Sequence, residues 1–100
     1  MNHTIQLGKR TISAASPTFI VAEVSANHNQ NYDRAVEIIH AAAEAGADAV
    51  KLQTYTADTL TIDCHDDCFM NKGGLWDGIS EYDLYKQAYT PWEWQPKLIE

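Results

Sequence analysis

Residues 18–54 read TFIVAEVSANHNQNYDRAVEIIHAAAEAGADAVKLQT, and this stretch decides the fold. Residues 18–25 are rich in β-branched and apolar side chains and too few for a buried helix, so they predict a strand buried on both faces. Apolar residues then recur at helical spacing between Asn31, which can cap a helix, and Gly46, which suits the position after a helix end. Residues 49–54 alternate as a second strand. The order strand, helix, strand predicts a parallel pair with a helical crossover, and hence an α/β fold.

The N-terminal residues 1–17 are predicted to form a β-hairpin. Residues 5–7 and 10–12 are short alternating runs, and Gly8 between them suits a tight turn. We therefore divide the chain into this hairpin, residues 1–17, and a region of βα units, residues 18–100.

The C-terminal half is predicted to hold a long loop followed by two helices. Residues 55–79 show neither a strand period nor a helix period, and loops of this length are usually functional or mobile. Ser80 begins a sequence that resembles a capping box, which predicts a helix through Tyr89. Thr90 and the proline after it predict a second helix. Pro96 would crowd a carbonyl four residues back, so this second helix either kinks or starts later.

Composition and charge exclude several classes of protein. The 100 residues carry 7 Lys and Arg against 14 Asp and Glu, a net charge of −7, which argues against nucleic acids and anionic membranes as partners. The longest apolar stretch is far shorter than the roughly 20 residues that span a bilayer. The first residues lack the basic and apolar regions of a secretory signal, so we expect a cytoplasmic location.

The two cysteines are candidate metal ligands. Cys64 and Cys68 flank a histidine and two aspartates, but a structural zinc site needs four ligands at recognisable spacings, and the sequence has no second cluster. We therefore expect reduced, free thiols and no metal site in this chain.

Charged and polar side chains alternate with apolar ones along both predicted strands. Glu23 and Ser25 share one parity on the first strand, and Lys51 and Gln53 share one on the second. If the apolar sets pack on outer helices, as in a barrel of parallel strands, these side chains converge on the interior near the catalytic end. A lysine there holds a carboxylate or phosphate, and a glutamate moves a proton or stabilises a cation. The alternative is a buried structural ion pair between Glu23 and Lys51.

The first predicted strand is followed directly by Asn27, His28 and Asn29. The amides suit the hydroxyl or amide groups of a ligand, and the imidazole can donate, accept or titrate. The alternative is that all three only form the turn and its caps.

Three stretches together resemble the sialic acid synthase family. They are FIVAEVSANHNQ at 19–30, AGADAVKLQTY at 45–55 and AYTPWEW at 88–94, and the last is similar to the pseudaminic acid synthase branch of that family. The resemblance covers nearly the whole chain. It implies that the chain supplies the hairpin and the first βα units of a TIM (β/α)8 barrel, with the rest of the barrel and a C-terminal antifreeze-like domain absent from it.

The resemblance also implies a reaction. Members of the family condense phosphoenolpyruvate with an acylated amino sugar to give a nine-carbon α-keto acid and phosphate, and the pseudaminic branch uses 2,4-diacetamido-2,4,6-trideoxy-L-altrose. They use a divalent metal, Mn, Mg or Co, whose paired histidine ligands lie on later strands outside this chain. They act as homodimers, and their products enter bacterial surface glycans such as those of flagellin.

Individual residues are carried over from the family motifs by position. Glu23 matches the active-site glutamate, and Lys51 matches the lysine that contacts phosphoenolpyruvate. Gln53 matches a residue near the acceptor sugar, and Asn27 and His28 match an Asn-His pair at the mouth of the site.

The sequence departs from N-acetylneuraminate synthases around the expected acceptor. Residues 24–26 and Gln30 stand where those enzymes show Ile-Gly-Ile and Gly. We interpret this as a changed acceptor pocket, in which Trp76 covers methyl or acetamido groups of a less polar sugar. Two alternatives stay open: a synthase for neuraminic or legionaminic acid, and an inactive fragment or binding module without catalysis.

Overall fold

The N-terminal hairpin is present in the computed structural model, which describes residues 3–100. Strand β1 (Ile5–Leu7) pairs antiparallel with β2 (Arg10–Ile12), and Gly8 turns the chain with a φ of 57°. This confirms the predicted strand pair; residues 1 and 2 of the predicted hairpin region lie outside the described residues. Arg10 forms an ion pair with Asp48, which ties the hairpin to the region that follows.

A parallel pair of strands forms the second sheet, as predicted. Strand β3 (Val21–Glu23) pairs with β4 (Ala49–Lys51), and Glu23 lies opposite Lys51 in the register. Both strands are shorter than predicted. Before β3 only half of the pairing continues: the Ile20 carbonyl accepts from the backbone N–H groups of Asp48 and Ala49, whereas the Ile20 N–H donates to the Asp48 carboxylate at 2.9 Å. The pairing stops after β3 because Ser25 adopts a φ of 54°, which turns the chain away.

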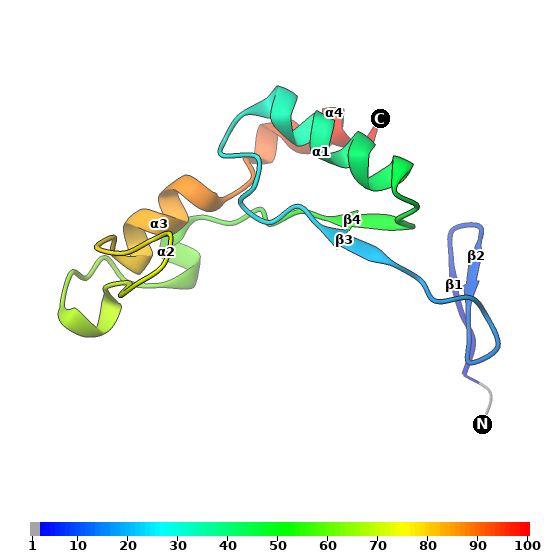
Figure 1. Cartoon of the computed structure of the whole chain (residues 1–100), viewed down its shortest axis with the longest axis horizontal. Helices are drawn as coiled ribbons and strands as arrows, with labels where there is room; N and C mark the ends of the chain where they lie inside the picture. Colours follow the sequence, from blue (N-terminus) through cyan, green and yellow to red (C-terminus); the bar gives the residue numbers. More distant parts are fainter. Residues whose placement is uncertain (1–2) are drawn as a thin grey trace.

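Helix α1 (Tyr32–Glu44) connects the two strands and lies along one side of them (Figure 1). Its start is fixed by Asn31, whose side-chain oxygen accepts a hydrogen bond from the backbone N–H of Arg34 at 3.0 Å. Its end is followed by Gly46 with a φ of 92°, a conformation that only glycine adopts without strain. Both ends were predicted from these residues, and both predictions are confirmed.

The loop predicted over residues 55–79 contains short regular structure. Helix α2 (Ala57–Leu60) is capped by Thr56 and Thr59, and a 3-10 turn, η1 (Asp67–Phe69), follows it. The prediction of an unbroken loop was therefore wrong at these two places. Each element is only about one turn long, which is too short to produce a detectable hydrophobic period in the sequence.

The C-terminal helices follow two different start signals. Helix α3 (Glu81–Ala88) begins after Ser80, whose Oγ accepts from the backbone N–H of Asp83 at 3.1 Å, as predicted. The last helix starts later than its first proline suggested: a 3-10 turn, η2 (Trp92–Trp94), precedes α4 (Gln95–Ile99). Pro96 then lies in the first turn of α4, where its missing N–H costs nothing.

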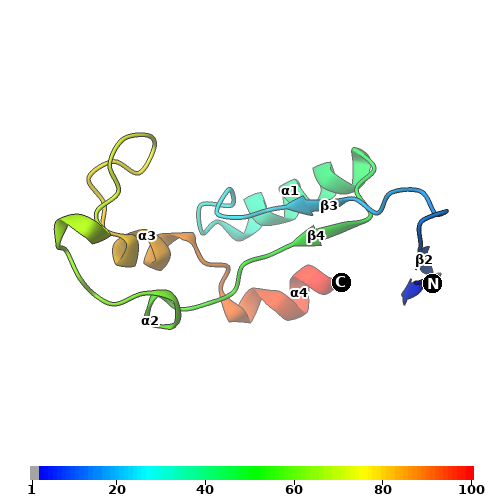
Figure 2. The same ribbon diagram turned by 90° about the horizontal axis from the view of Figure 1, so that it is seen from below.

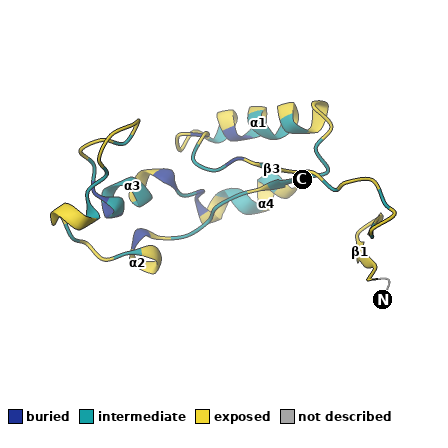
Figure 3. Cartoon of the chain, turned by 60° about the horizontal axis from the view of Figure 1, so that its bottom comes forward, coloured by how far each residue is buried: buried dark blue, intermediate teal, exposed yellow. Residues whose placement is uncertain are grey.

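Helices α1 and α4 lie on the same side of the parallel sheet, and the opposite side of the sheet is uncovered (Figures 1 and 2). The chain is correspondingly open, with a radius of gyration of 17.2 Å against about 13 Å for a compact domain of this length. Ile20 and Val21 are 53% and 48% exposed, and Figure 3 shows exposed surface on most elements. The mixed α/β class is thus confirmed, whereas closure into a barrel stays a prediction.

No helix within residues 3–100 is long and apolar enough to cross a membrane.

Candidate functional site

A charged pair lies at the carboxyl ends of the two parallel strands. Glu23 is the last residue of β3 and Lys51 the last of β4, and the ammonium group donates a hydrogen bond to the Glu23 carboxylate. Both side chains remain more than half exposed, at 60% for Glu23 and 52% for Lys51. The pair is therefore open to a ligand and is not the sealed ion pair that was the alternative.

The two faces of the sheet differ as the alternation of side chains predicts. Val50 lines a hollow beneath α1 together with Ile39 and Ala43 of that helix. Lys51, the next residue on β4, therefore projects to the other face, and Glu23 lies beside it in the register. The charged pair thus faces the uncovered side of the sheet, at the carboxyl ends of its strands.

The loop after β3 has a strained backbone and is held by internal hydrogen bonds. Ser25, Asn29 and Gln30 have φ values of 54°, 50° and 51°, in the region that favours glycine. The Asn27 amide donates to the Val24 carbonyl at 3.0 Å and folds the side chain onto its own loop. Asn27 nevertheless stays exposed at the surface, so its oxygen can accept from a ligand.

His28 is fully buried beneath this loop, and both of its ring nitrogens have partners. Its Nδ1 accepts from the backbone N–H of Gln30 at 3.0 Å, and its Nε2 lies 3.0 Å from the Thr90 hydroxyl. Because a backbone N–H can only donate, the proton of the neutral ring sits on Nε2 and is donated to Thr90. The Trp94 ring packs against the His28 ring in an edge-to-face arrangement, with the two ring centroids 5.4 Å apart. This geometry favours the alternative in which His28 forms the turn, while a direct contact with substrate stays a prediction.

Burial also sets the charge of His28. Desolvation lowers the pKa of its imidazole, because the charged form would lose its water without gaining an anionic partner. Protonation would also place a second N–H against the Gln30 N–H. The ring is thus a neutral structural element at neutral pH.

Gln53 joins the same framework through its backbone. Its carbonyl accepts from the Thr90 N–H at 2.8 Å, so Thr90 connects β4's continuation to the loop that follows β3. The side chain of the next residue, Thr54, accepts from the Gln95 amide at 2.6 Å. Gln53 itself is half-buried, and a contact of its side chain with the acceptor sugar stays a prediction.

A cavity of about 340 Å³ joins the loop after β3 to the long loop. Asn27 and Trp76 both line it, although 49 residues separate them along the chain. The remaining lining residues are Ser25, Ala26, Asn29, Arg34 and Leu75. The structure therefore brings two of the predicted substrate-binding residues into one cavity, and places Glu23 two residues before its rim.

The sequence profile of the NeuB family matches residues 38–100, which is more than half of the chain. The chain belongs to the NeuB family. The relatives include pseudaminic acid synthases. That of Campylobacter jejuni subsp. jejuni is 50% identical over 82 residues, covering 82% of this chain and 24% of the relative. That of Helicobacter pylori is 51% identical over 84 residues, covering 84% and 25%. The chain thus spans about a quarter of the length of these relatives.

A solved structure shows the same arrangement within the NeuB family. The spore coat polysaccharide biosynthesis protein SpsE of Bacillus subtilis aligns with 97% of this chain and 24% of its own, with a TM-score of 0.66 and 34% sequence identity. The short elements and open shape described above are therefore those of a recognisable part of a NeuB-family protein.

The metal that the family resemblance implies does not fit this part of the NeuB fold. Within residues 3–100, no three His, Cys, Asp or Glu side chains are grouped so that they could hold a metal ion. Cys64 and Cys68 are free thiols. His65 bonds instead to the Asp83 carboxylate at 3.0 Å, so we derive no chemical step from a metal bound here.

Two residues of the site were missed in the sequence. Thr90 was assigned only to a helix start, because its partner His28 lies 62 residues away and no local pattern links them. Arg34 stands in the first turn of α1, where a cation opposes the helix dipole and so has no structural benefit. That unfavourable placement was the one available signal.

Proposed function

We propose that this chain is the N-terminal part of a pseudaminic acid synthase. The observation that carries the proposal is its 50% identity with pseudaminic acid synthases over 82% of its length. The reaction joins carbon 3 of phosphoenolpyruvate to the aldehyde carbon of open-chain 2,4-diacetamido-2,4,6-trideoxy-L-altrose. Water adds at carbon 2, and phosphate leaves by cleavage of its carbon–oxygen bond.

The exposed pair at the strand ends supports this chemistry. Lys51 would hold the carboxylate or phosphate of phosphoenolpyruvate, since an ammonium on the open face neutralises such a group. Glu23 would then stabilise the cation that develops at carbon 2, or carry a proton to or from it. The pairing of the two before substrate binds keeps each charge compensated and the lysine aimed at the site.

The loop after β3 would form part of the binding site for the acceptor sugar. Asn27 and Trp76 line one cavity with Ser25, which comes two residues after Glu23. Gln53 comes two residues after Lys51, just past the end of β4. We place the amino sugar against Asn27, Trp76 and Gln53. His28 would fix the loop from below.

Other parts of the proposal extend beyond this chain. The divalent metal, Mn, Mg or Co, is proposed to bind residues outside it, and the complete protein is proposed to close a TIM barrel, to work as a cytoplasmic homodimer and to act on these small molecules, without nucleic acid or membrane partners. These statements rest on the family resemblance.

The test is turnover by the complete gene product. Phosphate release is measured with phosphoenolpyruvate, a divalent metal and either the diacetamido altrose or N-acetylmannosamine. We expect release with the diacetamido sugar only. Turnover of N-acetylmannosamine, or of the legionaminic acid precursor instead, would move the protein to a neighbouring synthase.

The same assay separates catalysis from a binding role. A complete gene product that binds the sugar but releases no phosphate with any acceptor would be a binding module. The 100-residue chain alone is expected to be inactive, because its catalytic face is uncovered.

A further inference from the structure

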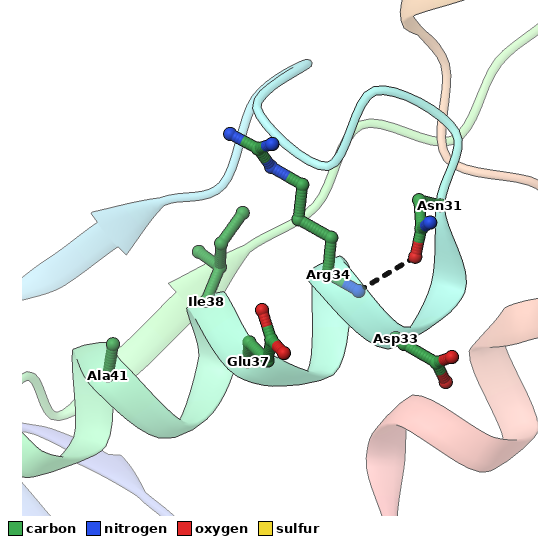
Figure 4. Close-up of a pocket in the computed structure, with 6 residues that line it drawn as sticks. All are labelled: Asn31, Asp33, Arg34, Glu37, Ile38 and Ala41. Atoms are coloured by element: carbon green, nitrogen blue, oxygen red, sulfur yellow. Dashed lines mark hydrogen bonds between the residues drawn. The ribbon is translucent and has the colours of Figure 1, made fainter.

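The cavity beside the loop after β3 contains a cation that the proposed function does not use. Arg34 comes from the first turn of α1, and its side chain reaches towards the loop after β3 and away from Asp33 and Glu37 (Figure 4). Among residues 3–100 its guanidinium makes no ion pair, whereas the other arginine, Arg10, is paired with Asp48. An unpaired guanidinium at a cavity keeps all its donors for a ligand.

The lining of the cavity combines polar and apolar side chains. Arg34, Asn27 and Asn29 offer amide and guanidinium groups, while Trp76 and Leu75 offer hydrocarbon and an aromatic face. A volume of about 340 Å³ lies at the lower end of the range for small-molecule sites. Such a cavity suits a ligand of monosaccharide size that carries both carbonyl oxygens and methyl groups.

An acetamido group has both features in one substituent. Its carbonyl oxygen accepts from a guanidinium or an amide N–H, and its methyl packs on an indole ring. Phosphoenolpyruvate fits this cavity less well, because its several negative charges would meet one cation and its only apolar portion, a single methylene group, would cover little of Trp76. Lys51, on the open face, is the better partner for that substrate.

We propose that Arg34 and Trp76 form a specificity subsite for one acetamido group of the acceptor sugar. Arg34 donates to the acetamido carbonyl, and Trp76 covers the methyl. The loop that completes the subsite is held rigid from below, since Gln30 donates to the carbonyls of Lys86 and Tyr89 at 3.2 and 3.4 Å. This inference rests on the proposed function and names the part of the substrate that the cavity recognises.

The test uses the complete gene product and determines KM separately for the sugar and for phosphoenolpyruvate. Arg34→Met and Trp76→Ala are each expected to raise the sugar KM about tenfold or more, the loss of one hydrogen bond to a charged group or one aromatic contact, with the phosphoenolpyruvate KM unchanged. Trp76→Phe, which keeps an aromatic face, should recover part of the loss. Glu37→Gln, one turn further along α1 and outside this cavity, is the matched control and should leave both KM values unchanged.

Sugar analogues that each lack one N-acetyl group identify the recognised substituent. With the analogue that lacks the recognised N-acetyl group, the wild-type protein should already show a raised sugar KM. Arg34→Met should not raise the KM for that analogue any further. Equal KM penalties with both analogues, an unchanged sugar KM in the variants, or a rise in the phosphoenolpyruvate KM would overturn the subsite while leaving the proposed function intact. A wild-type protein that does not turn over the diacetamido sugar would overturn both.

Discussion

The imidazole of His28 lies 3.0 Å from the hydroxyl of Thr90, and neither residue is exposed to solvent. This contact, together with the hydrogen bond from the Gln30 amide to the Tyr89 carbonyl, joins the loop after β3 to the segment between α3 and η2. The Thr90 backbone also donates to Gln53, so both strand ends that carry the candidate site are bound to the same residue. The site is therefore positioned by a buried polar network beneath it and by little hydrophobic core.

The first prediction concerns that network. Thr90→Val keeps the shape of the side chain but leaves the Nε2–H of His28 without an acceptor. We expect a loss of about 1–3 kcal/mol in the free energy of unfolding, the cost of a buried unsatisfied donor, measured by urea denaturation of the complete gene product. Thr11→Val, whose hydroxyl bonds to Gln6 in the exposed hairpin, is the control. An equal loss in both variants would contradict the importance of the buried contact.

The second prediction concerns pH. Burial lowers the pKa of His28 in the folded chain, so between that pKa and the ordinary value of about 6.5 the unfolded state binds more protons than the folded state. Stability should therefore be complete above about pH 6.5 and fall as the pH is lowered through this window. The measurement is the free energy of unfolding at a series of pH values.

Two histidine variants test whether His28 causes this dependence of the free energy of unfolding on pH. His28→Gln should lose the fall in stability between pH 7.5 and pH 5, apart from what other groups contribute. His40→Gln, on the exposed side of α1, removes one histidine without touching the buried network. Loss of this pH dependence in the His40 variant would contradict the assignment to His28.

Local signals in the sequence were sufficient for much of the fold. Asn31, Gly46 and Ser80 set helix ends through contacts within three or four residues, and such contacts leave a readable pattern. Helix α2 was not predictable in this way: it is only four residues long, and it packs against α3, where the Tyr82 hydroxyl donates to Asp58 at 2.9 Å. Tertiary contact, more than propensity, stabilises it.

The candidate site likewise contains residues that local sequence patterns could place and residues that only tertiary contacts could place. Glu23 and Lys51 could be placed together because strand alternation and parallel pairing follow from the local sequence. The buried state of His28 could not, since it depends on Thr90 and Trp94 from the far end of the chain. The sequence predicted both Asn27 and His28 at the mouth of the site. In the structure His28 is buried instead, where it supports the loop after β3.

The third prediction concerns the cap of α3. The Ser80 hydroxyl is buried, accepts from the Asp83 N–H at 3.1 Å and donates to the Asp83 carboxylate at 3.0 Å. Ser80→Ala should cost about 1 kcal/mol of stability, as for other N-cap serines, seen as a lower urea midpoint. Ser13→Ala removes a hydroxyl that bonds to the Ser16 hydroxyl and to the backbone N–H of Ala15 in a turn outside any helix, and a loss as large there would argue against a specific capping effect.

The last prediction separates catalysis from stability at the strand ends. The Glu23–Lys51 pair is more than half exposed on both sides, and exposed ion pairs contribute only about 0–1 kcal/mol to folding. Lys51→Ala should therefore leave the urea midpoint of the complete gene product almost unchanged, yet raise the KM for phosphoenolpyruvate at least tenfold, because the substrate loses a charged partner. Lys72→Ala, which breaks a still more exposed pair with Asp67 in the long loop, should leave both quantities unchanged. If the Lys51 variant kept a normal phosphoenolpyruvate KM, the pair would be a surface ion pair and nothing more; if its KM rose without loss of stability, the open face of the sheet would be the substrate-binding face.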